Sequence, residues 1–468
     1  MRAAASLCSM LVEPWLVRAT GARPLHTALA TPAESCTYSE LLAAARATAA
    51  ELGDRGVQAG DRVAIALPAG LAFAYALHAC LLLGVVAVPV DLRLSTVERE
   101  TIASGSKALI DREFFIDFDF DQGQGPRDAE LGSRAQLEHG YDPACHDLDA
   151  PAVVIHTSGT SAAPKPIELT YGNLLWSALG SAVALGLDSN ERWLCALPLS
   201  HVGGLSILVR SAIYGTTAVV HERFETDRVL HALQAEDVTL VSLVATTLAR
   251  LLDAGLERPP ALRCALTGGG SVPAALVARA TAAGVPVSMT YGLTESCSQV
   301  TTTPVALIAH GELGAGPPLF CTRVRCAEDG EVLVAGPTVA PGAVADDGWL
   351  HAGDLGSFDA RGNLSITGRK ADTIVSGGEN IAPSEVEAVL EAHPEVLEAA
   401  VVARPDEQWG EAVTAIVVAR SGTAPDAETL RAHCTASLAP YKVPKLVQLR
   451  TEPLPRTRSG KLLRRDLQ

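Results

Sequence analysis

The chain has 468 residues, of which 48% are hydrophobic and 19% are charged, so it is long enough for two or more globular domains. Its formal net charge of −16 argues against non-specific binding to nucleic acid or anionic membranes, and leaves room only for a local basic site that holds a phosphate ligand. The ten cysteines include no Cys-x-x-Cys pair, which argues against a zinc framework and indicates reduced thiols in a cytoplasmic protein.

Two apolar stretches resemble membrane or export signals. In the N-terminal segment, Glu13 and Pro14 interrupt the apolar residues early, so we expect no signal peptide. Residues 71–90 are mostly apolar over a length that could cross a bilayer. His78 and Gly84 interrupt this run, and β-branched residues follow, so the pattern predicts a buried helix and then a buried strand.

Helical and strand patterns alternate through most of the chain, beginning with residues 41–52 and 62–67. We expect strands at 153–157, 193–197, 217–220, 238–243, 262–267 and 285–290. We expect helices at 173–185, with Thr170 as its cap, and at 205–213, 227–234, 246–253 and 274–282. This alternation predicts an α/β fold with mostly parallel sheets covered by helices on both faces.

The pattern changes after about residue 310, where short strands are separated by Gly and Asp turns. Helices are expected at 384–392 and 427–437, with strands at 397–403 and 412–419, which together make a small α+β domain. We therefore predict a large N-terminal domain over 1–368, a hinge over 369–372 and a small mobile C-terminal domain over 373–468. The polar residues 117–128 are expected to form a surface loop.

One loop has the composition of a phosphate cradle. Residues 156–166, HTSGTSAAPKP, follow an apolar strand with a glycine, several hydroxyls and Lys165. Glycine lets backbone N–H groups approach an anion, hydroxyls add donors and lysine adds charge. The loop is not a Walker A motif, because Lys165 lies between two prolines. A polar surface turn is the alternative interpretation.

Four further motifs occur in a fixed order with this loop: YGLTES at 291–296, GWLHAGDLG at 348–356, GRKADTIVSGGENIAPSEVE at 368–387 and PRTRSGKLLRRDL at 455–467. Together they resemble the adenylate-forming superfamily of acyl-CoA synthetases, adenylation domains and luciferases over nearly the whole chain. Residues 197–225 and 262–300 resemble most the o-succinylbenzoate–CoA ligase branch, which serves menaquinone biosynthesis. The resemblance implies an ATP-dependent acid–CoA ligase that acts through an acyl-AMP intermediate, with ATP, Mg²⁺ and coenzyme A.

The resemblance also implies a set of ATP-binding residues. The loop residues around the phosphates would be Thr157, Ser158, Gly159, Thr160, Ser161 and Lys165. The remaining ATP contacts would be Gly268, Gly269, Gly270, Tyr291, Gly292, Thr294, Asp354, Arg369 and Lys461. Asp354 would bind the ribose hydroxyls with support from Arg369, and Tyr291 would pack on adenine. The family pattern has glycine where this chain has Ala162, and a methyl group there restricts the backbone of the loop.

The catalytic residues implied by the resemblance are Lys461, Glu295, His201 and Thr294. Lys461 would bridge the attacking carboxylate and the α-phosphate, and Glu295 would bind Mg²⁺, which favours carboxylate oxygen. The acid substrate would lie near His201, Gly204 and Arg210. Arg210 interrupts an apolar helical stretch and would meet a second carboxylate on the acid. Coenzyme A would be lined by Ser376, Gly377, Gly378 and Glu379.

Several of these residues could instead have a purely structural role. Glu295 fits the first turn of a helix, Asp354 fits an Asx-turn, His201 fits a structural histidine, and Arg210 fits a buried ion pair or a surface arginine. At the level of function, the alternatives are another aryl- or fatty-acyl-CoA ligase, a stand-alone carrier-protein adenylation enzyme, and a silent nucleotide sensor. The expected partners are a small acid, ATP and CoA, without nucleic acid or stable membrane insertion; the oligomeric state is left open.

Overall fold

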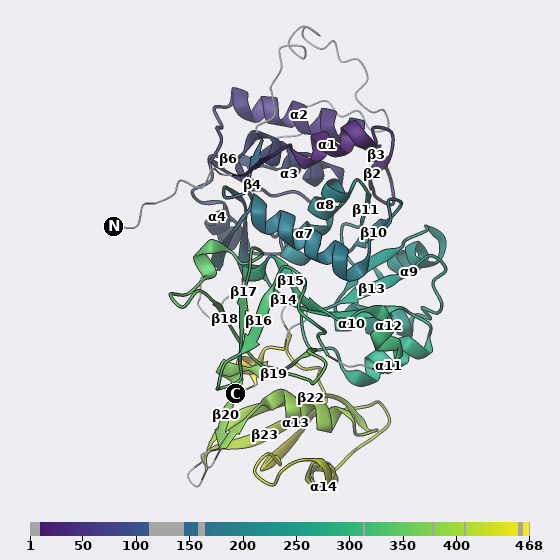
Figure 1. Ribbon diagram of the computed structural model, residues 1–468. Coiled ribbons are helices and arrows are strands. Elements are labelled where there is room, and N and C mark those ends of the chain that lie inside the picture. The colour runs from purple at the N-terminus through teal and green to yellow at the C-terminus, as the bar shows by residue number, and fades with distance from the viewer. Residues whose placement is uncertain are drawn as a thin grey trace.

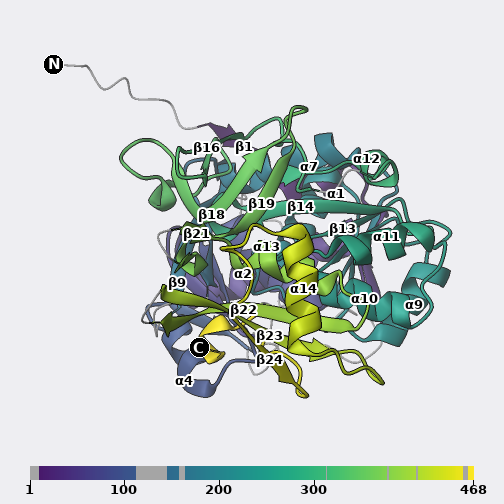
Figure 2. The same ribbon diagram turned by 90° about the horizontal axis from the view of Figure 1, so that it is seen from below.

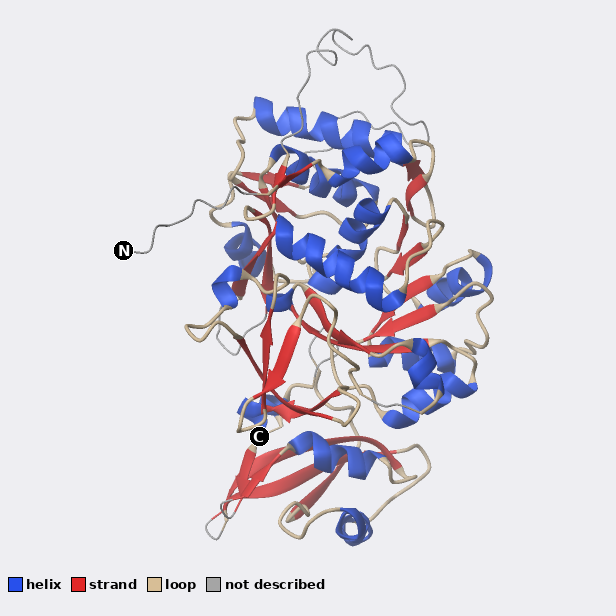
Figure 3. Ribbon diagram, in the orientation of Figure 1, coloured by secondary structure: helices blue, strands red, loops and turns tan. Residues whose placement is uncertain are grey.

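The computed structural model describes residues 10–111, 145–157, 164–311, 314–376, 379–406, 409–456 and 462–467. Figures 1 and 3 show a large part built of sheets and helices and a smaller C-terminal part on one side of it. The surface loop expected at 117–128 lies outside the described residues.

The first large sheet has its described strands in the order β6-β4-β5-β8-β9. These strands are β4 (Arg62–Ile65), β5 (Val86–Pro89), β6 (Ala108–Ile110), β8 (Pro151–Thr157) and β9 (Lys165–Thr170). The first four are mutually parallel, and β9 runs antiparallel to β8. The helix α4 (Thr96–Ala103) covers one face, and Ile102 packs there against the outward residues of the sheet.

The second large sheet has the order β15-β14-β13-β12-β10-β11-β2-β3. Its strands are β2 (Thr27–Ala30), β3 (Ser35–Thr37), β10 (Arg192–Cys195), β11 (Thr217–Val220), β12 (Leu240–Leu243), β13 (Cys264–Thr267), β14 (Val287–Leu293) and β15 (Ser298–Thr302). The six inner strands of this order, from β14 to β2, pair in parallel. The edge strands β15 and β3 are antiparallel to their neighbours. Helices α9 (Thr226–Ala235), α10 (Ala245–Asp253), α11 (Ala274–Ala282) and the short α12 (Val305–Ala309) pack on one face. The predicted α/β class with mostly parallel sheets covered on both faces is therefore confirmed.

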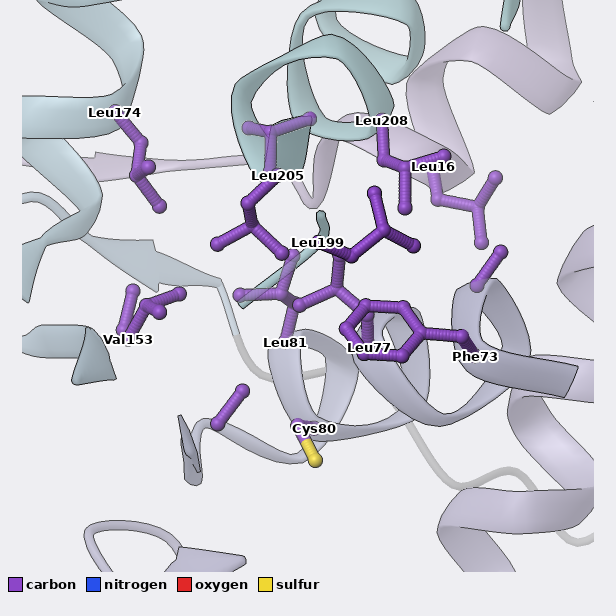
Figure 4. Packing of buried hydrophobic residues seen from close by; sticks show 14 of the residues in the cluster. Leu16, Phe73, Leu77, Cys80, Leu81, Val153, Leu174, Leu199, Leu205 and Leu208 are labelled. Atoms are coloured by element: carbon purple, nitrogen blue, oxygen red, sulfur yellow. The ribbon is translucent and has the colours of Figure 1, made fainter. Parts of the chain in front are cut away.

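Helices lie between the two large sheets and form the main core. They are α1 (Trp15–Ala22), α2 (Tyr38–Asp54), α3 (Leu71–Leu83), α7 (Tyr171–Leu185) and α8 (Val202–Tyr214). In Figure 4, Leu77 and Leu81 of α3 point toward Leu205 of α8, and Val153 of β8 lies at the side of this group. Each such leucine stabilises the fold by about 1.5–3 kcal/mol when it is fully buried.

Helix boundaries follow local chemistry that is visible in the sequence. Thr170 caps α7 as expected, because its hydroxyl accepts from the N–H of Asn173 while the Asn173 side chain accepts from the N–H of Thr170. The helix α3 ends at Gly84, which has the left-handed φ of 70° that glycine adopts without strain.

The apolar stretch 71–90 forms the buried helix α3 and the buried strand β5, as predicted. His78 lies inside this helix, and its burial lowers the pKa of the imidazole to about 4. In the described part of the chain, no helix combines the length and the apolar character needed to cross a membrane.

A third, antiparallel sheet contains β16 (Arg323–Cys326), β17 (Glu331–Ala335), β18 (Leu350–Phe358) and β19 (Leu364–Arg369) in that order. A two-stranded pair joins β1 (Leu11–Val12) to β7 (His146–Asp147). The described residues also form short 3₁₀ turns at Thr294–Ser296, Pro341–Ala343, Lys370–Asp372 and Arg464–Asp466.

The C-terminal part is an α+β unit with its own core. Its strands are β20 (Ile374–Ser376), β21 (Glu379–Ile381), β22 (Val396–Asp406), β23 (Gly410–Ala419) and β24 (Leu446–Arg450). Helices α13 (Pro383–Glu391) and α14 (Ala427–Ser437) pack on one face of this sheet (Figure 2). The unit touches β19 where the Ser384 hydroxyl donates to the Thr367 carbonyl. Within the described residues all nine cysteines are free thiols.

Candidate functional site

The predicted phosphate loop is held by a β-hairpin. Thr157 ends β8 and Lys165 begins β9, and these two residues are direct register partners. The Thr157 hydroxyl donates to the Lys165 carbonyl at 3.3 Å. Sequence analysis did not predict β9, in which Ile167 and Leu169 are buried while Glu168 between them is exposed. The loop residues Ser158, Gly159, Thr160, Ser161 and Ala162 lie outside the described residues.

Three of the predicted nucleotide residues meet at one point. Asp354 on β18 is 4% exposed, and its Oδ2 accepts from the Tyr291 hydroxyl at 2.7 Å. The other oxygen, Oδ1, lies 2.7 Å from Nε of Arg369. Asp354 and Arg369 are register partners on β18 and β19, whereas Tyr291 comes from β14 of the second large sheet. The cluster therefore joins the edges of two sheets around one buried carboxylate.

The Asp354 cluster differs from the Asx-turn alternative, because the carboxylate bonds to side chains of other strands. Burial raises the pKa of the Tyr291 hydroxyl, and the neighbouring Asp354 carboxylate raises it further. The tyrosine is thus a neutral donor at every physiological pH. Arg369 leaves part of its guanidinium exposed and also donates to the Ala352 carbonyl at 3.4 Å. This arrangement fits a binding site for paired hydroxyls such as those of a ribose.

Thr294 and Glu295 lie in the turn between β14 and β15. Glu295 lies in the first turn of a helix, as the alternative interpretation proposed, but this helix is a single 3₁₀ turn of three residues, Thr294–Ser296. Its backbone is held by hydrogen bonds from Ala340 N–H to the Glu295 carbonyl at 2.8 Å and from Cys297 N–H to the Thr294 carbonyl at 3.0 Å. The Glu295 carboxylate makes no ion pair with the residues that the structure describes. A half-buried carboxylate without a cationic partner among these residues is a suitable ligand for a hard cation.

Close backbone packing explains three of the predicted glycines. A Cβ at Gly292 would lie 1.7 Å from the Ser298 carbonyl oxygen, and one at Gly204 would lie 2.4 Å from the Pro198 carbonyl oxygen. A Cβ at Gly268 would lie 2.7 Å from Cγ2 of Thr290. Gly269 has a left-handed φ of 78°, and Gly270 faces open space. The fold therefore requires glycine at the three closely packed positions and favours it at Gly269, whereas Gly270 has open space beside its Cα.

His201 lies at the N-terminus of α8 and faces an arginine that sequence analysis did not single out. Nη2 of Arg93 is 3.4 Å from Nε2 of His201. Arg93 follows β5 and is held by the Asp91 carboxylate, at 2.8 Å from Nε to Oδ1 and 2.5 Å from Nη2 to Oδ2. Burial alone would raise the pKa of Asp91, but hydrogen bonds from Arg93 outweigh it and the pKa is lowered. Arg93 and His201 are 108 positions apart, so only the fold brings them together.

Arg210 is buried in the interior of the large part and is 2% exposed. Its Nη2 donates to the Ser177 hydroxyl at 3.0 Å, and its guanidinium carbon lies 5.6 Å from the centre of the Trp193 ring. Burial lowers the pKa of Arg210. The predicted contact of this residue with a substrate carboxylate stays a prediction.

The predicted CoA residues lie on a short hairpin of the C-terminal part. Ser376 ends β20 and pairs with the exposed Glu379 of β21, whereas Gly377 and Gly378 lie outside the described residues. The Ser376 hydroxyl is buried without a hydrogen-bond partner among the described residues. Lys461 also lies outside the described residues, next to a bridge between Arg456 and Leu462.

Ion pairs flank the predicted hinge on both sides. Nζ of Lys370 is 2.6 Å from Asp329 and 2.8 Å from Glu331, which belong to the third sheet and its turn. These hydrogen bonds raise the pKa of the Lys370 ammonium group. On the other side, Arg464 lies 2.9 Å from Asp372 and 2.7 Å from Glu387 of α13.

Comparison with known proteins identifies the family to which this chain belongs. A model of the AMP-binding enzyme family matches residues 16–343, and a model of the AMP-binding enzyme C-terminal domain matches residues 385–461. The chain belongs to the AMP-binding enzyme family. Among curated members of this family, it is 38% identical to a 2-succinylbenzoate–CoA ligase of Bacillus subtilis strain 168, over 98% of both chains. It is 36% identical to a protein of the same name from Geobacillus kaustophilus, over 97% of this chain and 96% of the relative.

Solved structures of the AMP-binding enzyme family agree with these sequence matches. The o-succinylbenzoate CoA synthetase of Bacillus subtilis in complex with the acyl-adenylate intermediate OSB-AMP has a TM-score of 0.84, with 36% identity over 98% of both chains. The same enzyme in complex with ATP and magnesium ion has a TM-score of 0.83, with 37% identity over 97% of this chain and 99% of that chain. A fatty acyl CoA synthetase of Mycobacterium tuberculosis has a TM-score of 0.71, with 29% identity over 97% and 96%.

Proposed function

We propose that this protein is a 2-succinylbenzoate–CoA ligase that works in the cytoplasm in menaquinone biosynthesis. The observation that carries the proposal is the 38% identity to a 2-succinylbenzoate–CoA ligase over 98% of both chains. The site geometry supports an adenylate-forming reaction, because the turn that carries Glu295 directly follows the strand of Tyr291, whose hydroxyl donates to the buried Asp354 carboxylate.

The reaction has two steps. In the first, a carboxylate oxygen of the acid attacks the α-phosphorus of ATP, and the bond to the β-phosphate oxygen breaks, which gives acyl-AMP and pyrophosphate. In the second, the sulfur of CoA attacks the acyl carbon, the thiol proton is lost, and AMP leaves. The first step joins two anions, so the site must supply positive charge and aligned donors.

The residues of this chain have distinct roles in the proposal. Asp354 accepts hydrogen bonds from the ribose hydroxyls, with its carboxylate fixed by Arg369 and Tyr291. Lys165 at the mouth of the hairpin and Lys461 from the C-terminal end supply positive charge to the phosphates and the attacking carboxylate. Thr294 approaches the α-phosphate from the turn that also carries Glu295.

Glu295 fits a magnesium ion that enters with ATP. Mg²⁺ is held in such sites by one or two carboxylates together with substrate phosphates, and it does not need a cluster of protein ligands. The described residues contain no group of three or more His, Cys, Asp or Glu side chains that could hold a metal ion. When bound, the ion would neutralise charge that develops on the phosphates.

The acid has a second carboxylate, which must be recognised without being activated. Arg93 places a guanidinium beside His201 at the N-terminus of α8, where the Asp91 carboxylate fixes its Nε edge. A bidentate or water-mediated contact from the remaining edge suits a carboxylate. We therefore add Arg93 to His201 and Gly204 as a candidate for the acid site.

We also propose the division into a large domain over 1–368, a hinge over 369–372 and a C-terminal domain over 373–468. The separate core of the C-terminal part and its single short connection through Lys370–Asp372 support this division. Ser376 and Glu379 would reach the CoA tunnel after rotation at the hinge, because the adenylation lysine must then leave the reacting carbon.

The decisive experiment is a product assay with the purified protein. It is incubated with ATP, Mg²⁺ and CoA and with one of three acids: o-succinylbenzoate, benzoate or a fatty acid. Mass spectrometry should detect o-succinylbenzoyl-CoA and AMP, with kcat/KM for o-succinylbenzoate far above that for the other acids. A preference for benzoate or a fatty acid would refute the proposed substrate, and acyl-AMP without any CoA thioester would point to a carrier-protein adenylation enzyme.

A further inference from the structure

Arg210 is a buried cation that the proposed function does not use. No carboxylate lies within ion-pair distance of its guanidinium among the described residues, and its Nε is buried without a hydrogen-bond partner. A buried charge without an opposite charge is unfavourable, so the residue needs another explanation. The alternative of a surface arginine does not apply, because the side chain of Arg210 does not reach solvent.

The position of Arg210 on α8 separates it from His201. Nine residues of α-helix correspond to about 13 Å along the axis and to two and a half turns, so the two side chains leave opposite faces of the helix. His201 is the N-cap residue of α8 and faces Arg93, whereas Arg210 faces Ser177 of α7 and Trp193 of β10. The two residues therefore belong to different surroundings.

A chain of two hydrogen bonds leads from Arg210 to the turn that carries Glu295. Nη2 of Arg210 donates to the Ser177 hydroxyl at 3.0 Å, and that hydroxyl donates to the Cys297 carbonyl at 2.5 Å. Hydrogen bonds in series strengthen one another, because the guanidinium polarises the hydroxyl and makes it a stronger donor. All three residues are buried, which shields these bonds from bulk solvent.

The Cys297 carbonyl lies in a strained segment. Cys297 has φ of 54° and Ser298 has φ of 95°, which are left-handed values that non-glycine residues adopt at a cost. The strain arises because β14 must reverse into β15 within the few residues from Thr294 to Cys297. Such a conformation persists only where neighbouring groups fix it, and the bond from Ser177 fixes it directly beside Glu295.

We propose that Arg210 and Ser177 are positioning residues that anchor the Cys297–Ser298 turn and so aim Glu295 and Thr294 at the metal–nucleotide complex. This role rests on the proposed assignment of Glu295 to Mg²⁺. It replaces the direct contact with the acid that the sequence suggested for Arg210, and it requires no further ligand. The lysine variant should retain part of the effect, because an ammonium group can also donate to the Ser177 hydroxyl.

The test measures MgATP binding by calorimetry with the full-length protein, in the absence of acid and CoA. Ser177→Ala and Arg210→Met should each weaken MgATP binding about tenfold, the size expected from one buried hydrogen bond. The double variant should be no weaker than the more affected single variant, because both changes interrupt one chain. Arg210→Lys should bind more tightly than Arg210→Met. The matched control is Ser181→Ala, which removes another buried hydroxyl of α7 and should leave MgATP binding unchanged.

Steady-state kinetics separate this role from a substrate contact. The KM for o-succinylbenzoate should be unchanged in Ser177→Ala and Arg210→Met, while kcat falls. The proposal is overturned if Arg210→Met leaves MgATP binding intact and raises the KM for the diacid but not for a mono-acid analogue. If Arg210→Met does not fold, Ser177→Ala decides, since it removes a single atom. Unchanged MgATP binding in Glu295→Gln would overturn the magnesium assignment, while wild-type product formation tests the proposed function separately.

Discussion

The carboxylate of Asp354 gives the most direct test of the nucleotide site. We expect Asp354→Asn to preserve the shape of the side chain while changing one acceptor into a donor. The carboxylate now accepts from the Tyr291 hydroxyl and from Nε of Arg369, each at 2.7 Å. The amide can satisfy only one of these donors, so the other donor faces an N–H group. The same change removes one charged acceptor from the ribose hydroxyls.

The magnitude follows from the charge of the acceptor. A hydrogen bond to a charged group contributes about 1.5–3 kcal/mol, and each 1.4 kcal/mol is about a factor of ten. The KM for ATP in pyrophosphate exchange should therefore rise about 10- to 150-fold. The free energy of unfolding should fall by about as much again, because the internal hydrogen bond is lost whether or not ATP is bound.

The control for this change is Asp359→Asn in the turn between β18 and β19. Asp359 accepts from the backbone N–H groups of Arg361 and Asn363 at 2.8 Å, at the far end of the strand that carries Asp354. The Asp359→Asn substitution should lower the free energy of unfolding without changing the KM for ATP. A folded Asp354→Asn protein with the wild-type KM for ATP would refute the assignment of this carboxylate to the ribose.

Three further predictions concern catalysis, pH and packing. Lys461→Ala should abolish pyrophosphate exchange but spare thioester formation from supplied acyl-AMP, and an equal loss in both half-reactions would contradict this division. Burial raises the pKa of Glu391 from its usual 4.5 to about 7, so the folded chain holds a proton that the unfolded chain loses, and stability falls as pH rises from 4.5 to 7. Glu391→Gln should remove this fall, worth about 3 kcal/mol, in urea titrations at several pH values; a slope that persists in the variant would assign it to other groups. Leu77→Ala, at a fully buried site, should lower the free energy of unfolding by about 2–5 kcal/mol, whereas Leu449→Ala, at a side chain that is 52% exposed, should change it by less than about 0.5 kcal/mol.

Much of the fold could be predicted because periodicity and capping act locally. The helix at 274–282 and the strand at 217–220 match the structure at both ends, since Pro273 and the flanking glycines limit them. The strand β9 was missed because prolines and a lysine begin it, and its antiparallel partner β8 is what orders it. Local propensity does not contain that pairing.

The site was predicted less completely than the fold. Motif resemblance pointed to Asp354, Arg369 and Tyr291, and the structure brings these three together. Arg93, which we propose for the acid site, was not found from the sequence, because its partner His201 comes from a distant segment and no motif marked it. The surroundings of Arg210 were also hidden, since a guanidinium in an apolar stretch can face solvent, a substrate or, as observed, the interior.

In the proposed hinge, ion pairs hold the residues on both sides of Ala371 in the short 3₁₀ turn Lys370–Asp372. Lys370 is fastened to the third sheet, and Asp372 is fastened to Arg464 of the C-terminal unit. A rotation that keeps both ion pairs intact would be absorbed by the backbone dihedral angles in and next to Ala371, the single residue between them. The two ion pairs would then be the fixed points on either side of the pivot. The rotation of the C-terminal unit would depend on Ala371, a residue that carries no charge.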